Sequence, residues 1–172
     1  MGNMDKHIYL IGFMGVGKTS TSRELVRLLG VEEVEMDARI VAENGMSIND
    51  MFALFGEEYF RDRETDMIAK IASEAPAVVS CGGGAVLRPT NVELMKKSGV
   101  IVLLTAEPQT VFGRVKDATD RPILNGHMNV DYIAGLMEKR RAIYESVCDV
   151  RIATDGKTPR QVASEIVPLC SQ

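Results

Sequence analysis

Short runs of apolar and β-branched residues alternate along this chain with segments in which apolar residues recur every three or four positions. Runs of the first kind are typical of buried strands, and repeats of the second kind are typical of helices with one buried face. Their alternation predicts an α/β fold built from βαβ units, with a parallel sheet covered by helices on both faces. Candidate strands span residues 8–11, 34–36, 77–80, 100–104 and 150–153. Candidate helices span residues 19–29, 37–43, 48–55, 57–73, 91–97, 108–115, 130–146 and 159–169.

The pattern is interrupted at one place. Residues 116–129 are polar, include a proline and a glycine, and lack periodicity. Long irregular segments inside compact domains are often lids, and Arg121 in this segment is suited to meet phosphate charge. We therefore predict a mobile lid here, the alternative being a loop without a function. No repeat or linker divides the chain, so we expect residues 1–172 to form a single domain.

The loop after the first candidate strand carries the clearest chemical signal. Residues 12–19 read GFMGVGKT and fit the pattern G-x-x-x-x-G-K-[ST] at every fixed position. In such a loop, backbone N–H groups surround the phosphates of a nucleoside triphosphate, the lysine reaches the β- and γ-phosphates, and the hydroxyl binds Mg²⁺. The following helix points its N-terminus at the phosphates. We expect a nucleoside triphosphate and Mg²⁺ as ligands, with nucleotide contacts from Gly12, Gly15, Val16, Gly17, Lys18, Thr19 and Ser20.

Acidic and hydroxyl side chains end the next two candidate strands. Glu35 and Asp37 close the second strand, and Ser80 closes the third. The carboxyl ends of strands in open α/β sheets face the ligand crevice. If both acids lie on the strand, they point to the same face and can serve the magnesium ion, through water, and an acceptor hydroxyl. The alternative is that Asp37 is only the N-cap of a helix beginning at residue 38. Ser80 is placed to hold a metal-bound water.

Three glycines lie shortly after Ser80, at residues 82–84. They leave a backbone without side chains, to which a ligand can form hydrogen bonds directly. The alternative is that the glycines only form a tight turn.

Arg61 and Glu64 share one face of a strongly charged candidate helix, and Arg140 lies on a later helix. Two arginines from separate helices are suited to clamp a carboxylate through bidentate hydrogen bonds. The alternative is that these charges only form a solvated surface.

Composition narrows the class of protein. The formal net charge of −4 gives no basic field for nucleic acid, and no apolar run approaches the ~20 residues of a membrane span. Residues 1–6 form no apolar signal segment. The three cysteines have no CxxC spacing, which argues against a disulfide scaffold or a zinc site. We expect a cytoplasmic monomer without a nucleic-acid or membrane partner.

In the order and spacing of these features, the chain resembles the shikimate kinases, within the nucleoside-monophosphate-kinase-like branch of P-loop proteins. The specific motifs are G-E-x-x-F-R at residues 56–61, S-x-G-G-G-A at 80–85, R-P-I-L at 121–124 and M-x-K-R-x-x-I-Y at 137–144. The likeness runs from residue 8 to about residue 167. It implies a three-layer α/β/α fold of the P-loop NTPase type, with a five-stranded parallel sheet, a shikimate-binding helical region at residues 37–73 and a lid at residues 116–129.

The resemblance also implies a reaction, the transfer of the ATP γ-phosphate to the 3-hydroxyl of shikimate, in aromatic amino acid biosynthesis. By position, Asp37 orients the acceptor hydroxyl, Arg61 and Arg140 grip the shikimate carboxylate, and Glu64 steadies those arginines. Catalysis then rests on Asp37 together with Lys18 and Arg121. Further implied contacts are those of the Gly83 and Gly84 backbone with shikimate, of Arg121 with the phosphates, and of Arg114, Lys157 and Pro159 with adenine.

The chain departs from the family pattern in Glu35, which replaces the usual aspartate, and in Ala142, which replaces a proline. Two other functions remain open. One is a related small-molecule kinase acting on gluconate or another hydroxy acid, since an arginine pair indicates an anionic acceptor without identifying its ring. The other is a regulatory protein that binds nucleotide without turnover, against which the intact Lys18, Asp37 and Arg121 argue.

Overall fold

Five strands form a parallel sheet in the computed structural model, which describes residues 4–116 and 129–170. The strands are β1 (His7–Ile11), β2 (Glu32–Glu35), β3 (Ala77–Ser80), β4 (Gly99–Thr105) and β5 (Val150–Ala153). Their order across the sheet is β2-β3-β1-β4-β5, and every neighbouring pair is parallel. The prediction of a five-stranded parallel sheet is confirmed.

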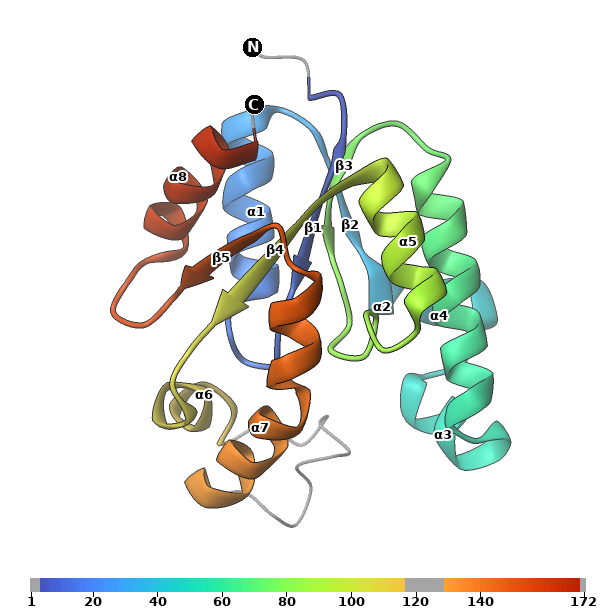
Figure 1. Ribbon diagram of the computed structural model, residues 1–172. Helices are drawn as coiled ribbons and strands as arrows, with labels where there is room; N and C mark the ends of the chain where they lie inside the picture. Colours follow the sequence, from blue (N-terminus) through green and yellow to red (C-terminus); the bar gives the residue numbers. More distant parts are fainter. Residues whose placement is uncertain (1–3, 117–128, 171–172) are drawn as a thin grey trace.

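Helices cover both faces of this sheet, and the three-layer fold of the P-loop kinase type is therefore also confirmed (Figure 1). Helices α1 and α8 pack together on one face, whereas α5 and α7 pack against β4 on the other. In the described residues no helix is both long and apolar enough to cross a membrane. The helices are α1 (Lys18–Leu29), α2 (Met36–Asn44), α3 (Ile48–Phe55), α4 (Glu57–Ala72), α5 (Pro89–Ser98), α6 (Pro108–Val115), α7 (Val130–Val147) and α8 (Pro159–Cys170).

The burial of the strands follows their place in the sheet. Every residue of β1 and of β3 is buried, as expected for strands with a neighbour on each side and helices on both faces. The edge strands β2 and β5 expose charged side chains such as Glu32 and Arg151. Charged side chains at an edge discourage pairing with another chain. The sheet therefore supplies a rigid core that holds the loops at the carboxyl ends of its strands.

The second strand begins and ends earlier than the sequence indicated. It was expected at residues 34–36, but β2 spans Glu32–Glu35, and Met36 is already the first residue of α2. The Glu35 side chain accepts a hydrogen bond of 2.8 Å from the Ala38 amide and so caps the helix. Met36 is fully buried. Because of this cap the helix begins before Asp37. Glu35 therefore lies at the end of the strand, and Asp37 lies in the first turn of the helix.

The segment predicted to be a lid falls almost entirely outside the described residues. Only its two ends are described. Lys116 is the exposed C-cap of α6, and Asn129 caps α7 by accepting a 2.8 Å hydrogen bond from the Tyr132 amide. The predicted lid and the roles predicted for Arg121 therefore stay predictions.

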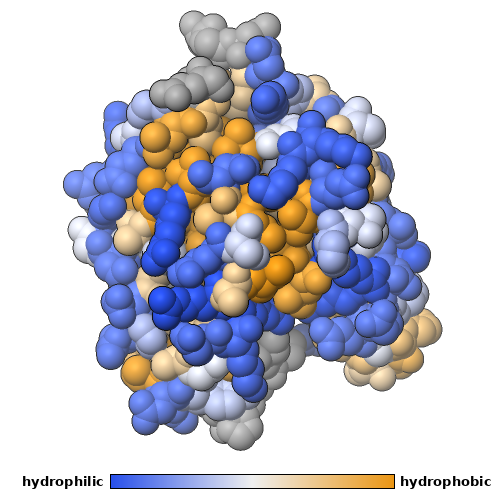
Figure 2. Space-filling view, viewed as in Figure 1, coloured by the Kyte–Doolittle hydropathy of each residue, from blue (hydrophilic) through white to orange (hydrophobic). Residues whose placement is uncertain are grey.

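Apolar side chains also form a groove on the face that α5 and α7 cover, between these two helices (Figure 2). Charged residues, including Glu93, Lys96 and Lys97, border it. The groove shares no lining residue with the larger cleft at the carboxyl ends of the strands. Its apolar lining consists of Val86, Pro89, Val92, Ile143 and Val147.

Candidate active site

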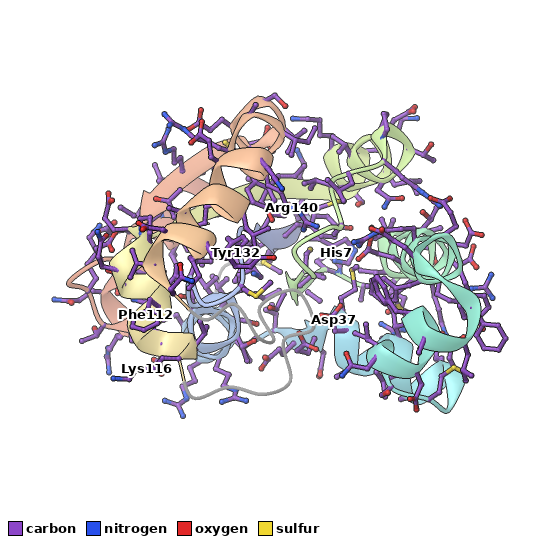
Figure 3. The ribbon with its side chains drawn as sticks, turned by 90° about the horizontal axis from the view of Figure 1, so that it is seen from below. His7, Asp37, Phe112, Lys116, Tyr132 and Arg140 are labelled. Carbon is purple, nitrogen blue, oxygen red and sulfur yellow. The ribbon has the colours of Figure 1, made fainter. Side chains whose placement is uncertain are left out.

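A cleft of about 640 Å³ lies at the carboxyl ends of the strands, which Figure 3 views from below. Two of its walls are marked there by Asp37 on α2 and Arg140 on α7, which approach the same central region from different elements. The cleft brings together most of the residues predicted from the sequence. These are Gly15, Gly17, Lys18, Thr19, Ser20, Glu35, Asp37, Arg61, Ser80, Gly83, Gly84, Arg114 and Arg140.

The loop between β1 and α1 depends on glycine at two positions. Gly17 has φ 100° and lies directly before the first residue of α1, so the helix begins at Lys18 with its N-terminus at the cleft. Gly12 has φ 144°, and a Cβ there would lie 2.5 Å from the carbonyl oxygen of Leu104. Only glycine satisfies both conditions. The Lys18 ammonium donates hydrogen bonds to the carbonyls of Gly12 and Phe13, at 2.8 and 3.0 Å, and so lies across the loop.

Helix α6 and strand β5 support this loop from the other side. Arg114 donates a 2.9 Å hydrogen bond to the carbonyl oxygen of Gly15. Thr154, at the end of β5, is buried and donates a 2.9 Å hydrogen bond to the carbonyl oxygen of Val16. Val16 itself is buried, so its contribution to a nucleotide site is through its backbone. These contacts fix the loop against β5 and place Arg114 beside the nucleotide side of the cleft.

Two residues predicted to contact adenine lie outside the cleft lining. Lys157 forms a 3.0 Å ion pair with Glu165 on α8, and Pro159 is exposed as the first residue of the same helix. Neither lines the cleft. Their contact with adenine stays a prediction.

The placement of Asp37 corrects two expectations. The sequence suggested that Glu35 and Asp37 share a strand face, but Asp37 lies in the first turn of α2. The alternative that Asp37 is the N-cap is also wrong, because Glu35 provides the cap. Both carboxylates nevertheless line the cleft, since the chain turns from β2 into α2 at its edge. Burial raises the pKa of Glu35, and the hydrogen bond from Ala38 opposes that shift.

Oxygen donors gather next to the phosphate-binding loop. Ser80 pairs in register with Glu35 on the neighbouring strand, and Thr19 lines the same cleft from the start of α1. Hydroxyl and carboxylate oxygens are the donors that Mg²⁺ prefers. In residues 4–116 and 129–170, no group of three or more His, Cys, Asp or Glu side chains is arranged to hold a metal ion. The donors present thus fit a magnesium ion that is bound mainly by nucleotide phosphates and water.

The arginine pair predicted from two distant segments does converge. Arg61 on α4 and Arg140 on α7 both line the cleft, and we call them the arginine clamp. The Arg61 Nη1 atom donates a 3.0 Å hydrogen bond to Oε1 of Glu64, which is fully buried. Burial raises the pKa of Glu64 to about 7, while the charges of Arg61 and Arg140 oppose the rise. Glu64 therefore holds Arg61 at the floor of the cleft.

The glycine turn after β3 explains why the arginines and Asp37 can approach so closely. A Cβ on Gly84 would lie 2.5 Å from Cζ of Arg61. A Cβ on Gly82 would lie 2.7 Å from Oδ1 of Asp37, and one on Gly83 would lie 3.3 Å from Nη1 of Arg140. Real Cβ atoms are not found at the first two distances. Gly82 and Gly84 thus leave the room that the side chains of Asp37 and Arg61 occupy against the backbone of the turn.

Sequence reasoning missed an apolar wall of the same cleft. Ile48 and Phe52 on α3, together with Phe60 on α4, line the side opposite the phosphate-binding loop. The Arg61 guanidinium lies 5.3 Å from the centre of the Phe60 ring. Apolar residues at helical spacing are usually core residues, so their pattern gave no signal of a site. The wall offers a surface for the ring of a small organic acid whose carboxylate meets the arginines.

Comparison with known proteins agrees with this geometry. The family model described as shikimate kinase matches residues 14–171. The shikimate kinase of Thermodesulfovibrio yellowstonii is 42% identical over 162 residues, covering 94% of this chain and 93% of that protein. The shikimate kinase of Geobacter metallireducens is 42% identical over 161 residues, covering 94% and 89%. The structure of shikimate kinase from Acinetobacter baumannii in complex with shikimate superposes with a TM-score of 0.91 at 32% identity, covering 97% of this chain and 93% of that one. The chain belongs to the shikimate kinase family.

Proposed function

We propose that this protein transfers the γ-phosphoryl group of ATP to the 3-hydroxyl of shikimate, releasing ADP and shikimate 3-phosphate. One observation carries the proposal. The phosphate-binding loop, the arginine clamp and Asp37 line one cleft. Membership of the shikimate kinase family supports the same reaction. The hydroxyl oxygen bonds to the γ-phosphorus as the bond to the β-γ bridging oxygen breaks, and the hydroxyl proton leaves the acceptor.

The nucleotide side of the cleft supplies positive charge and backbone donors. Lys18 exchanges the carbonyls of Gly12 and Phe13 for the phosphates, and its charge follows the transferred group. Adenine lies near Arg114, with Lys157 and Pro159 at its rim, and Arg121 closes on the phosphates. Backbone contacts come from Gly12, Gly15, Val16 and Gly17, with Thr19 and Ser20 at the start of α1.

Magnesium supplies charge neutralisation on the phosphates when it is bound. Thr19 would hold the ion, and Glu35 and Ser80 would hold its water ligands. Burial raises the pKa of Glu35 by disfavouring its charged form, and a cation bound nearby would oppose that shift as the Ala38 amide already does. These three residues lie on different elements that meet at the loop.

The acceptor side recognises a hydroxy acid. The arginine clamp takes the shikimate carboxylate, and the amides of Gly83 and Gly84 contact the substrate. Asp37 orients the 3-hydroxyl and accepts its proton. Phe52 and Phe60 give the ring an apolar surface. Residues 37–73 thus form the shikimate-binding region within a single domain of residues 1–172.

The protein acts as a monomer in the cytoplasm. The free thiols of Cys81, Cys148 and Cys170 support a reducing compartment. A cleft of about 640 Å³ has the size for a small-molecule acceptor. The negative net charge argues against nucleic acid as a partner.

A coupled ADP-release assay with shikimate, quinate and gluconate as separate acceptors tests this function, and ³¹P NMR identifies the product. We expect turnover with shikimate and Mg·ATP, and none with Lys18→Ala, which lacks the cation that follows the γ-phosphate. Preferred turnover of gluconate would assign the protein to a different hydroxy-acid kinase activity. Tight ATP binding without ADP release from any acceptor would instead indicate a nucleotide-binding protein without turnover.

A further inference from the structure

The side chain of Tyr144 joins two parts of the cleft that are far apart in the sequence. Its hydroxyl donates a 2.6 Å hydrogen bond to the carbonyl oxygen of Gly83. Arg140 lies one turn earlier on α7. A Cβ on Gly83 would lie 3.3 Å from Nη1 of Arg140 and 3.6 Å from the Tyr144 hydroxyl oxygen, so both side chains pack against this glycine. The phenol oxygen therefore bonds the glycine turn next to one arginine of the clamp.

Burial gives this contact its strength. Tyr144 is 5% exposed and does not line the cleft itself. Burial raises the pKa of its hydroxyl, although Arg140 opposes the shift, so the group stays protonated and remains a donor at neutral pH. A hydrogen bond in such surroundings is costly to leave unmade.

The bond to Gly83 determines more than the position of one carbonyl. A peptide unit is planar, so fixing the direction of the Gly83 carbonyl also fixes the direction of the Gly84 N–H. Glycines have wide backbone freedom, and a run of three needs an external anchor to hold one conformation. The turn supplies two bonds of its own, from Ala85 to the Gly82 carbonyl and from Leu87 to the Gly84 carbonyl. Tyr144 supplies the bond to the carbonyl between them.

We propose that Tyr144 is a positioning residue for the acceptor, which aligns the Gly84 amide and the Arg140 guanidinium in one arrangement. This inference rests on the proposed function, since it assigns both groups to the binding of shikimate. Tyr144 acts through these two groups and not by contact with the nucleotide. Its loss should therefore affect the acceptor and leave ATP binding intact.

The test compares Tyr144→Phe with Tyr9→Phe, each of which removes one hydroxyl from a buried tyrosine. Tyr9 is fully buried on β1, and its hydroxyl lies 2.7 Å from Oγ of Ser98, away from the cleft lining. Steady-state kinetics with shikimate and with ATP as the varied substrate, together with the melting temperature, are measured for wild type and both variants. For Tyr144→Phe we expect the KM for shikimate to rise by about three- to tenfold, with the KM for ATP changed by less than about twofold. Tyr9→Phe should leave both constants unchanged.

A KM for shikimate within about twofold of wild type in Tyr144→Phe would overturn the proposal, and so would a parallel rise of both constants. Failure of Tyr144→Phe to fold while Tyr9→Phe folds would assign Tyr144 to stability alone and also overturn it. The proposed function is judged separately, from the wild-type protein. If wild type releases no ADP with shikimate, the proposed function fails and this inference fails with it.

Discussion

Arg61 and Glu64 form a buried ion pair across one turn of α4, with Nη1 of the arginine 3.0 Å from Oε1 of the glutamate. Glu64 is fully buried, and Arg61 is 8% exposed. A second ion pair, with the exposed Glu57, holds the outer side of the same guanidinium. Arg61 is thus fixed from both sides before any acceptor binds, which lowers the cost of ordering it on binding.

Glu64 should make stability depend on pH in a direction opposite to that of most carboxylates. Its pKa is raised from the ordinary 4.5 to about 7 by burial, with Asp37 adding to the rise and Arg61 and Arg140 opposing it. The folded state therefore binds the proton more tightly than the unfolded state. The contribution of Glu64 is most favourable below about pH 4.5 and is lost as the pH rises through about 7. The loss is at most about 3.4 kcal/mol, at about 1.36 kcal/mol for each of the roughly 2.5 pH units between the two pKa values.

Urea unfolding of wild type and Glu64→Gln from pH 5 to 8 measures this dependence. The free energy of unfolding of wild type, relative to that of Glu64→Gln, should fall as the pH rises across this range. Contributions of the other titrating groups largely cancel in the difference. A difference that stays constant or grows with pH would show that Glu64 is already ionised at pH 5.

Gly84→Ala should damage acceptor binding because its Cβ has no room. The added carbon would lie 2.5 Å from Cζ of Arg61, and Arg61 is held by Glu64 and cannot move freely. We expect the KM for shikimate to rise by about tenfold or more, comparable with loss of a charge-assisted partner. The matched control is Gly135→Ala on α7, where a Cβ meets nothing within 4 Å. That variant should keep wild-type kinetics and gain up to about 1 kcal/mol in stability, because alanine favours the helix. Wild-type kinetics in both variants would contradict the packing described for Gly84.

The two arginines of the clamp should differ in what their removal costs. Arg140→Ala should weaken shikimate binding by about ten- to a hundredfold and leave ATP binding intact, since it removes one charged partner of the carboxylate. Arg61→Ala should do the same and also lower the free energy of unfolding by about 1–3 kcal/mol, because the buried Glu64 carboxyl then loses its hydrogen-bond partner. Arg141→Ala is the control, because Arg141 is exposed and pairs with Glu138 and Glu145 at the surface. Isothermal titration with each ligand and urea unfolding separate the two effects. Unchanged shikimate affinity in both Arg61→Ala and Arg140→Ala would contradict the role of the arginine clamp in binding the carboxylate.

Those parts of the site that depend on residue spacing within one segment could be predicted from the sequence. The loop at residues 12–19 and the pairing of Arg61 with Glu64 follow from such spacing, because backbone geometry fixes neighbours three or four residues apart. The order of the strands in the sheet could not be predicted from such local spacing. Strand β1 lies between β3 and β4, and nothing in its own residues specifies those neighbours. The convergence of Arg61 with Arg140 depends on that topology and was suggested by resemblance alone.

One error and one omission have physical causes. Glutamate is not among the usual N-cap residues, so the cap that Glu35 provides, and the earlier start of α2, had no sequence signal. Tyr144 is the last residue of the motif at residues 137–144, but nothing in the sequence indicated a role for its hydroxyl. Its hydrogen bond to Gly83 becomes evident only when α7 is placed beside the glycine turn.

The corrected position of Asp37 sharpens the test of its role. It lies in the first turn of α2 without capping the helix, so Asp37→Asn removes a charge but no cap. If Asp37 orients the acceptor hydroxyl and takes its proton, turnover should fall by about 10²- to 10⁴-fold. The free energy of unfolding should change by no more than about 1 kcal/mol, the usual effect of a first-turn charge.

Asp50→Asn is the matched control, because Asp50 is a first-turn acid of α3 that is exposed and does not line the cleft. Rapid-quench measurement of a single turnover isolates the chemical step from product release, and urea unfolding gives the stability of both variants. We expect a slow chemical step in Asp37→Asn alone, with similar small changes in stability for the two. Wild-type single-turnover rates in Asp37→Asn would mean that the carboxylate has no part in the transfer. In that case the loose transition state of phosphoryl transfer would need little proton removal. The arginine clamp would then be the main group that positions the acceptor hydroxyl.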